Sequence, residues 1–300
     1  MPQATKEIQR RIKSISNTKK VTKAMEMVAA SKMRKAVNNV LATRSYSNLA
    51  WDLVKTLASK TDSKYHPLLK RKKEIKKIGL VLVTSNRGLC SDFNTSIINR
   101  VLRYIKENSE AQIELIVLGK KGRDFMYKKG HEIIAEFEKL DITTKVIEIR
   151  PLAKLLVEDF VNNKFDKVVL SYTDFVSTLV QKPRVLELLP IVSKVKDTDL
   201  GKVNEQEVKK IENKDFEYLF EPTPDQVLSE LLPRLIEMQI YQAILESDAS
   251  EHSARMVAMR GASDAATEMI DDLTLIFNKA RQSSITAELA DISGGRLAME

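Results

Sequence analysis

The residues with the clearest potential for chemistry follow the first predicted strand. They read Thr84-Ser85-Asn86-Arg87-Gly88-Leu89-Cys90, and a glycine-containing loop after a strand is where many α/β proteins bind phosphate. One glycine stands here instead of the three of a dinucleotide-binding loop, and the chain has no GxxxxGK[ST] motif. The second predicted strand ends in Leu118-Gly119-Lys120-Lys121-Gly122, without the Ser or Thr that a Mg²⁺ site requires. Both loops argue against nucleotide binding.

The histidines and the cysteine are dispersed. His66, His131 and His252 lie in different predicted elements, and none has a metal-ligand partner at helical spacing. His252 falls on an apolar stripe, where a packed or rim position is the usual role. Cys90 is the single cysteine, which fits a reducing compartment, and after a strand end a buried thiol is the expected role. We therefore expect no catalytic residue, no cofactor and no metal site.

The N-terminal segment has the features of one long helix. From Gln3 to His66 there is neither proline nor glycine, and apolar residues recur in steps of three and four. The spacing predicts an amphipathic helix over residues 4–58, on the order of 80 Å long at 1.5 Å per residue. Its apolar positions are Ile8, Ile12, Ile15, Val21, Met25, Val28, Met33, Ala36 and Val40.

The C-terminal segment carries a longer and more regular stripe. Alternate steps of three and four from Leu228 to Ala280 meet sixteen positions, of which thirteen are apolar. A heptad of this length is typical of a coiled-coil seam. The exceptions are Gln242, His252 and Ser263. Pro222 and Pro224 mark the predicted entry and Gly294–Gly295 the predicted exit, while Pro233 is expected to kink the helix or displace its start.

Between the helices the pattern changes to strands alternating with helices. Short apolar runs predict strands at 78–84, 113–118, 146–149 and 167–172, with helices near 94–107, 122–129 and 152–162. This alternation predicts a small α/β domain with a Rossmann-like parallel sheet. We divide the chain into an N-terminal coiled-coil helix (1–60), an α/β domain (74–220) and a C-terminal coiled-coil helix (224–293).

Charge is uneven along the chain, whose net charge is +8. Residues 1–60 carry thirteen Lys/Arg and three Asp/Glu, whereas residues 246–300 carry five and ten. A basic beginning and an acidic end favour pairing of the two helices, although each run is also explained as a solvated face. Since one helix enters the α/β domain and the other leaves it, a pair must be antiparallel, with the tip of the longer C-terminal helix alone.

One helical stretch is apolar nearly all the way round. It is Ala24–Ala30, bracketed by Lys19, Lys20, Lys23, Lys32, Arg34 and Lys35. A helix of this kind is normally enclosed. The enclosure is either a thicker interface with one partner helix or a collar of other subunits around a shaft.

Three segments resemble signatures of the ATP synthase gamma family. They are Arg11–Arg34 (RIKSISNTKKVTKAMEMVAASKMR), Glu246–Met259 (ESDASEHSARMVAM) and Asn278–Glu288 (NKARQSSITAE). Thr84–Cys90 and Leu219–Pro222 match weaker blocks. Nearly the whole chain is covered. Departures from the family pattern are Ser91-Asp92 in place of a small pair, Asp291 in place of Glu, and the charged tail Arg296–Glu300.

The resemblance implies a function and a set of partners. It implies a central rotor shaft that is not itself an enzyme and couples ion translocation to ATP chemistry, with alpha, beta and epsilon subunits and a membrane c-ring as partners. By motif, the residues expected to face the beta subunits are Met27, Arg255, Arg281, Gln282, Thr286 and Glu288. Tyr218 and Glu221 are expected near the c-ring and epsilon subunit.

The sequence also bears on where the protein lies in the cell and on two alternative functions. No signal peptide or spanning segment is visible, which favours the cytoplasmic side of a bacterial plasma membrane with peripheral attachment. One alternative is a coiled-coil protein that binds nucleic acid through its basic helix, but only Tyr46 and Trp51 near those lysines are suited to base stacking. A small α/β enzyme with helical dimerisation arms is the other, and it would need a ligand site in 74–220.

Overall fold

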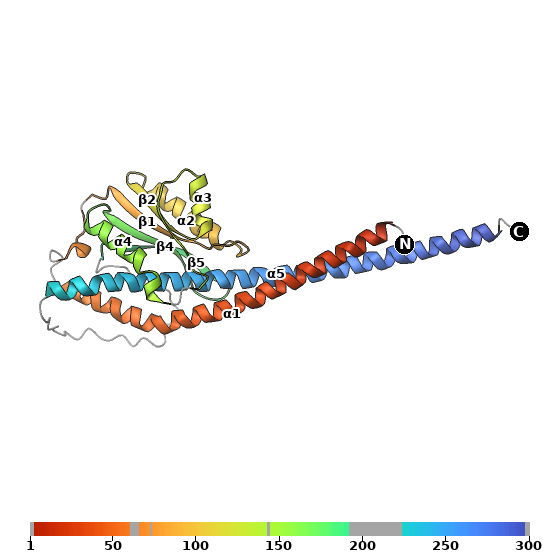
Figure 1. Cartoon of the computed structure of the whole chain (residues 1–300), viewed down its shortest axis with the longest axis horizontal. Coiled ribbons are helices and arrows are strands. Elements are labelled where there is room, and N and C mark those ends of the chain that lie inside the picture. The colour runs from red at the N-terminus through yellow and green to blue at the C-terminus, as the bar shows by residue number, and fades with distance from the viewer. Residues whose placement is uncertain (1–2, 61–65, 73, 143–144, 192–223, 298–300) are drawn as a thin grey trace. The chain divides into compact units, whose positions relative to one another are not determined.

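The computed structural model describes residues 3–60, 66–72, 74–142, 145–191 and 224–297 (Figure 1). They belong to two compact units. The first, called the body here, is made of residues 30–254, and the second, the helical pair, of residues 1–29 and 255–300. Helices α1 (Gln3–Lys60) and α5 (Pro224–Leu297) contribute to both units. The two long helices are confirmed, whereas the three-part domain division stays a prediction.

A five-stranded sheet forms the centre of the body, in the order β3-β2-β1-β4-β5. The strands β1 (Lys77–Val83), β2 (Gln112–Leu118), β3 (Ile133–Phe137) and β4 (Lys167–Phe175) are parallel. The fifth, β5 (Gln181–Leu189), is antiparallel to β4. The mixed α/β class with a mostly parallel sheet is as predicted.

Three details of the predicted strands are wrong. Residues 146–149 are not a strand: Val146–Glu148 form the 3₁₀ helix η2, which leads into α4 (Arg150–Val161). Pro151 stands in the first turn of α4, where its fixed φ favours a helix start. β3 and β5 were not predicted, because as edge strands they are mostly half-buried and lack a clear apolar pattern.

Helices cover both faces of the sheet. Successive side chains of a strand point to opposite faces, so β1 contributes Leu80 and Leu82 to one core and Val81 and Val83 to the other. The first core is closed by α2 (Phe93–Glu107) and α3 (Lys120–Lys128). The second is closed by α4, the 3₁₀ helix η1 (Pro67–Leu69) and the body's parts of α1 and α5. Figure 1 shows α5 passing along this second face.

The C-terminal helix begins where it was predicted to begin but ends later than predicted. It starts at Pro224, as expected, and Pro233 lies inside it. The predicted exit at Gly294–Gly295 is wrong, since helix continues to Leu297. Glycine costs a helix about 1 kcal/mol relative to alanine but does not remove a backbone hydrogen bond as proline does. In the part of the chain that the structure describes, no helix is long and apolar enough to cross a membrane.

The seam on α5 is buried first and then gradually exposed. Most predicted seam positions from Leu228 to Ala266 are buried, the others in that range being half-buried, as are Ile270, Leu273, Phe277 and Ala280. Beyond Ala280, the described side chains up to Ser293 are exposed except that of Ser284. The end of α5 therefore has no partner helix within the helical pair, as the unequal helix lengths predicted.

Two predicted core positions of α1 are wrong. Val21 is 59% exposed and Val28 is 54% exposed. The inward positions in these turns belong instead to Thr22, Glu26 and Ala29. Polar side chains take the core positions here because each has a specific partner across the helical pair, described below.

Candidate functional site

The loop after β1 and the start of α3 fill the position where an α/β protein would hold a phosphate. The first three backbone N–H groups of α3 donate hydrogen bonds to this loop: Lys120 to Asn86 Oδ1 (3.2 Å), Lys121 to Ser85 O (3.1 Å) and Gly122 to Thr84 Oγ1 (2.9 Å). A phosphate at a helix N-terminus binds through these same groups. The chain itself occupies them, so this loop and helix have no phosphate cradle.

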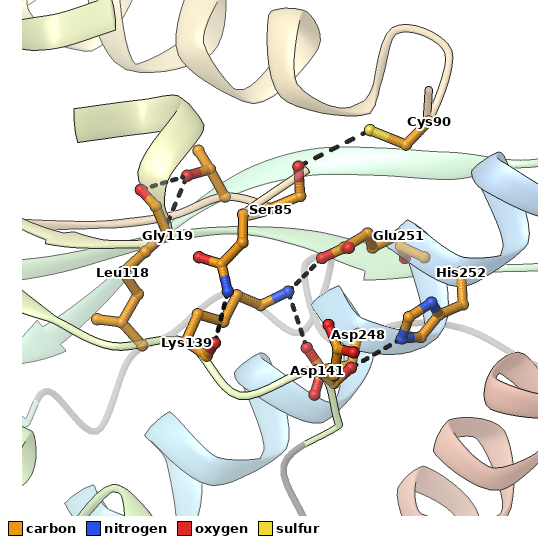
Figure 2. Close-up of polar contacts among 12 residues, drawn as sticks. Ser85, Cys90, Leu118, Gly119, Lys139, Asp141, Asp248, Glu251 and His252 are labelled. Carbon is orange, nitrogen blue, oxygen red and sulfur yellow. Dashed lines mark hydrogen bonds and ion pairs between the residues drawn. The ribbon is translucent and has the colours of Figure 1, made fainter. Parts of the chain in front are cut away.

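Gly119 makes the close approach of the two loops possible. Its φ is +98°, and a Cβ at this position would lie 2.3 Å from the Thr84 carbonyl oxygen. Only glycine fits so close to another backbone in that conformation. The tight contact between β1 and β2 loops therefore depends on Gly119, and Thr84 Oγ1 adds hydrogen bonds to the Leu118 and Gly119 carbonyls (Figure 2).

Asn86 extends this contact to the segment after β3. Its side-chain Nδ2 donates to the Lys139 carbonyl oxygen at 2.6 Å. Residues 138–141, called the β3 loop here, are thereby held beside the β1 loop. The β3 loop carries two charged side chains, Lys139 and Asp141, that reach the long helices.

Lys139 forms a buried ion-pair cluster with α5. Its Nζ lies 2.9 Å from Asp248 Oδ1 and donates to Glu251 Oε2, and the side chains are 2%, 0% and 8% exposed respectively (Figure 2). Burial alone would lower the pKa of this lysine, but the two carboxylates outweigh it and raise the pKa. A buried ammonium between two carboxylates binds strongly only when it stays charged. The cluster therefore fixes the β3 loop to α5.

Asp141 completes the connection to both helices. His252 Nε2 lies 2.8 Å from the Asp141 carbonyl oxygen, and since a carbonyl only accepts, Nε2 carries the hydrogen. The Asp141 carboxylate accepts from Lys32 Nζ of α1 at 2.7 Å, which lowers its pKa. Burial lowers the pKa of His252. One short loop thus contacts both α1 and α5.

The α5 stretch inside the body is enclosed although it is rich in polar residues. Residues 243–254 are all buried. Ser250 Oγ donates to the Thr173 carbonyl (3.2 Å) and Ser253 Oγ to the Thr178 carbonyl (2.7 Å), both on the β4–β5 side. Ser250 and Ser253 are thus paired with the sheet side, which makes the burial of their hydroxyl groups possible.

Each polar exception in the predicted seam has a specific partner. Gln242 Oε1 accepts from Thr43 Oγ1 at 2.8 Å, His252 binds the Asp141 carbonyl, and Ser263 Oγ lies 2.8 Å from Thr22 Oγ1. Polar residues at single seam positions specify the register of paired helices. The first and third contacts therefore restrict how the two helices align, within the body and within the helical pair respectively, and the second holds α5 to the β3 loop.

Glu26 forms a second polar layer in the helical pair. It is 6% exposed, and its carboxylate accepts from Lys23 (2.9 Å) and from Arg260 of α5 (3.1 Å). These hydrogen bonds lower its pKa, that from Lys23 most. In the Glu26–Arg260 pair the acidic residue lies on the basic N-terminal helix and the basic residue lies on the acidic C-terminal helix. This is the reverse of the arrangement that the net charges of the two helices suggest. Net charge did not predict this pairing.

The residues expected to contact beta subunits are mainly at the surface of the chain. Met27 is 60% exposed, and Arg281, Gln282, Thr286 and Glu288 are also exposed. Arg255 is half-buried. Tyr218 and Glu221 lie outside the described residues. Met27 lies on α1 and the other five described residues lie on α5.

The remaining candidates for chemistry have structural roles. Cys90 is buried, as predicted, and accepts from Asn94 Nδ2 at 3.2 Å. His66 Nδ1 accepts from the Leu68 backbone at 3.2 Å and caps η1, while His252 is packed as predicted. Among the described residues, no cluster of His, Cys, Asp or Glu could hold a metal ion.

Sequence reasoning missed the β3 loop and Glu26. Lys139 and Asp141 stand in an unremarkable charged stretch, and their partners lie about 110 residues away. One signal was present: the helix segment 243–254 contains several acidic and serine residues, so its enclosure requires a donor from elsewhere. That signal indicates a buried cation without saying which one.

Comparison with known proteins gives consistent matches along the chain. A family model described as ATP synthase matches residues 4–299. An ATP synthase gamma chain of Herpetosiphon aurantiacus is 41% identical, with 99% of both chains covered. One from Dehalococcoides mccartyi is 42% identical, with 97% of this chain and 98% of the relative covered.

Solved structures have the same fold at lower identity. A chain of the Euglena gracilis mitochondrial ATP synthase (OSCP/F1/c-ring, rotational state 3) has a TM-score of 0.65 and 19% identity, covering 99% of this chain and 94% of its own length. A chain of the Tetrahymena thermophila mitochondrial ATP synthase central stalk and c-ring has a TM-score of 0.62 and 24% identity. It covers 81% of this chain and 99% of its own length.

Proposed function

The chain belongs to the ATP synthase gamma chain family, and from this premise we propose that it is the central rotor shaft of a rotary ATP synthase. It is a non-catalytic subunit that couples ion translocation to ATP synthesis and hydrolysis in a catalytic head. One structural observation carries the proposal for the head. The end of α5 beyond Ala280 has no partner helix within the helical pair, yet it exposes Ile285, Leu289 and Ile292, and the turns just before it expose Leu275 and Ile276.

The outward apolar residues of α1 support the same proposal. Val21, Met27 and Val28 are each more than half exposed, while the inward positions of these turns are already filled by half-buried Thr22 and buried Glu26 and Ala29. The outer face is therefore free for other subunits, as in a shaft within a collar. This favours the collar over a thicker two-helix interface.

The proposal assigns partners to surfaces. The alpha and beta subunits surround the helical pair, with Met27, Arg255, Arg281, Gln282, Thr286 and Glu288 facing beta. The epsilon subunit and the c-ring contact the body, with Tyr218 and Glu221 on that side. The complex lies on the cytoplasmic side of a bacterial plasma membrane, to which this chain is attached peripherally.

Rotation explains why the chain needs no active site of its own. Contacts that differ between angular positions bias each beta subunit among its conformations, which is how the state of one site reaches another. Such contacts must be made and broken in every turn. A permanent bond between the shaft and one beta subunit is therefore incompatible with continuous turnover.

A reversible cross-link tests this directly. Cys90→Ser removes the native thiol, and Gln282→Cys is paired with a cysteine on the facing beta loop of the assembled complex. Oxidation should abolish multi-turnover ATP hydrolysis, and reduction should restore it. Complexes with only one of the two new cysteines are the controls for oxidation. Full turnover with the bridge quantitatively formed, and again with a bridge at Arg255→Cys, would contradict rotation of this surface against beta.

A further inference from the structure

The β3 loop connects the sheet of the body to both long helices. From the sheet side it is held by Asn86 and by its covalent continuity with β3. Lys139 binds Asp248 and Glu251 of α5, the Asp141 carbonyl binds His252 of α5, and the Asp141 carboxylate binds Lys32 of α1. All of these contacts lie within the body.

We propose that the β3 loop is the torque-bearing joint that locks the sheet to the two shaft helices, with Lys139 and Asp141 as positioning residues. This rests on the proposed rotor function. A rotor must transmit twist from the body to its helices, and an apolar interface resists sliding weakly because hydrophobic contact is non-directional. Directional contacts with buried charges resist displacement, since moving one partner leaves a buried charge unpaired.

The geometry is suited to resisting rotation about the helix axes. Lys139 contacts two carboxylates three residues apart, Asp248 and Glu251, which are neighbours on one face of α5. The hydroxyl groups of Ser250 and Ser253 donate hydrogen bonds to the backbone carbonyls of Thr173 and Thr178 on the sheet side. α5 is therefore held by directional bonds from the β3 loop and from the β4–β5 side, while Lys32 holds α1 to the same loop.

Torsional stiffness is the property to measure. The head is immobilised, a bead is attached through Tyr127→Cys in a Cys90→Ser background, and the angular variance of the bead is recorded during pauses. Tyr127 is 78% exposed on α3, so the label sits on the sheet side of the joint. Angular variance rises as torsional stiffness falls. Lys139→Met removes two of the four contacts between the β3 loop and the helices, so it should raise the variance about twofold.

Lys32→Gln provides a second variant, which we expect to fold. Lys32 and Asp141 are 32% and 57% exposed, so the stability lost is small, and the variance should still rise measurably. Lys32→Arg, which keeps the charge, should restore the original variance. Lys154→Gln removes the exposed Lys154–Glu158 pair within α4 and should leave the variance unchanged.

The outcomes separate the joint from the rotor itself. A complex of the unsubstituted chain that never rotates would overturn the proposed function. Rotation with unchanged variance in Lys32→Gln, and in Lys139→Met where it assembles, would overturn the joint alone. An equal rise in Lys154→Gln would also overturn it, because the effect would then be general loosening. If Lys139→Met does not assemble, the Lys32→Gln and Lys32→Arg pair decides.

Discussion

Single residues hold the loops of the body in place, and Gly119 shows this most directly. Gly119→Ala should destabilise the chain more than Gly130→Ala. Both glycines have positive φ, a backbone conformation that alanine adopts only with strain. A Cβ at Gly119 would also lie 2.3 Å from the Thr84 carbonyl oxygen, whereas one at Gly130 meets nothing within 4 Å. Denaturant unfolding of the two variants measures the difference, and equal losses would show that the close approach carries no energetic weight.

His252 gives the body a predicted pH dependence. Burial lowers its pKa in the folded state, so its neutral form is favoured there relative to the unfolded chain. The corresponding stability is present above the unfolded pKa of about 6.5. It is lost as the pH falls from there through the folded pKa, by at most about 1.4 kcal/mol per pH unit.

His252→Gln keeps a side-chain N–H donor for the Asp141 carbonyl but cannot titrate. Melting temperatures measured from pH 7 down to pH 5 should fall less steeply in this variant than in the unsubstituted chain. His131→Gln serves as the control histidine substitution, because His131 lies outside the contact with Asp141. Parallel pH profiles for the His252 variant and the unsubstituted chain would contradict the assignment.

At the scale of elements, burial along α5 predicts which substitutions are costly. Leu245 is fully buried in the core against the sheet, and Leu275 is 70% exposed. Leu245→Ala should lower the free energy of unfolding by about 2–5 kcal/mol. Leu275→Ala should change it by no more than about 0.5 kcal/mol. Chemical denaturation of the isolated chain provides the comparison within one helix and one residue type. Similar costs would mean that α5 is not stabilised by this core.

The elements differ in how far they could be predicted. The long helices follow from residue spacing alone, and β1, β2 and β4 from continuous apolar runs, because both signals are local. β5 escaped prediction because Pro183 and its charged neighbours are tolerated only at an edge, and edge position is decided by the tertiary fold. The β3 loop escaped for the same reason: the roles of Lys139 and Asp141 are set by partners far away in the chain.

At the scale of the whole molecule, the outer face of α1 is predicted to matter for assembly and not for folding. Val28→Asp changes an exposed side chain, so unfolding of the isolated chain should shift by about 0.5 kcal/mol or less. Assembly with the catalytic head should weaken strongly, since a carboxylate without a partner is costly to bury. Reconstitution of ATPase complexes measures it, with Tyr127→Asp on the exposed face of α3 as the matched charge control.

Two results would contradict this expectation. Normal assembly of Val28→Asp would mean that other subunits do not enclose the face formed by Val21, Met27 and Val28. Equal weakening by Tyr127→Asp would mean that added negative charge, and not its position, opposes assembly.

The core of the body contains residues that the ribosome synthesises at very different times. Ala36 and Val40 of α1 share their core with Leu228 to Ala249 of α5. The ribosome must add roughly 200 residues between these partners, which takes about 10–40 s at 5–20 residues per second. Throughout that interval the apolar stripe of the first helix has left the ribosome without its native neighbour. The newborn chain therefore needs a temporary cover for this stripe, supplied by a chaperone or by non-native contacts, until α5 arrives.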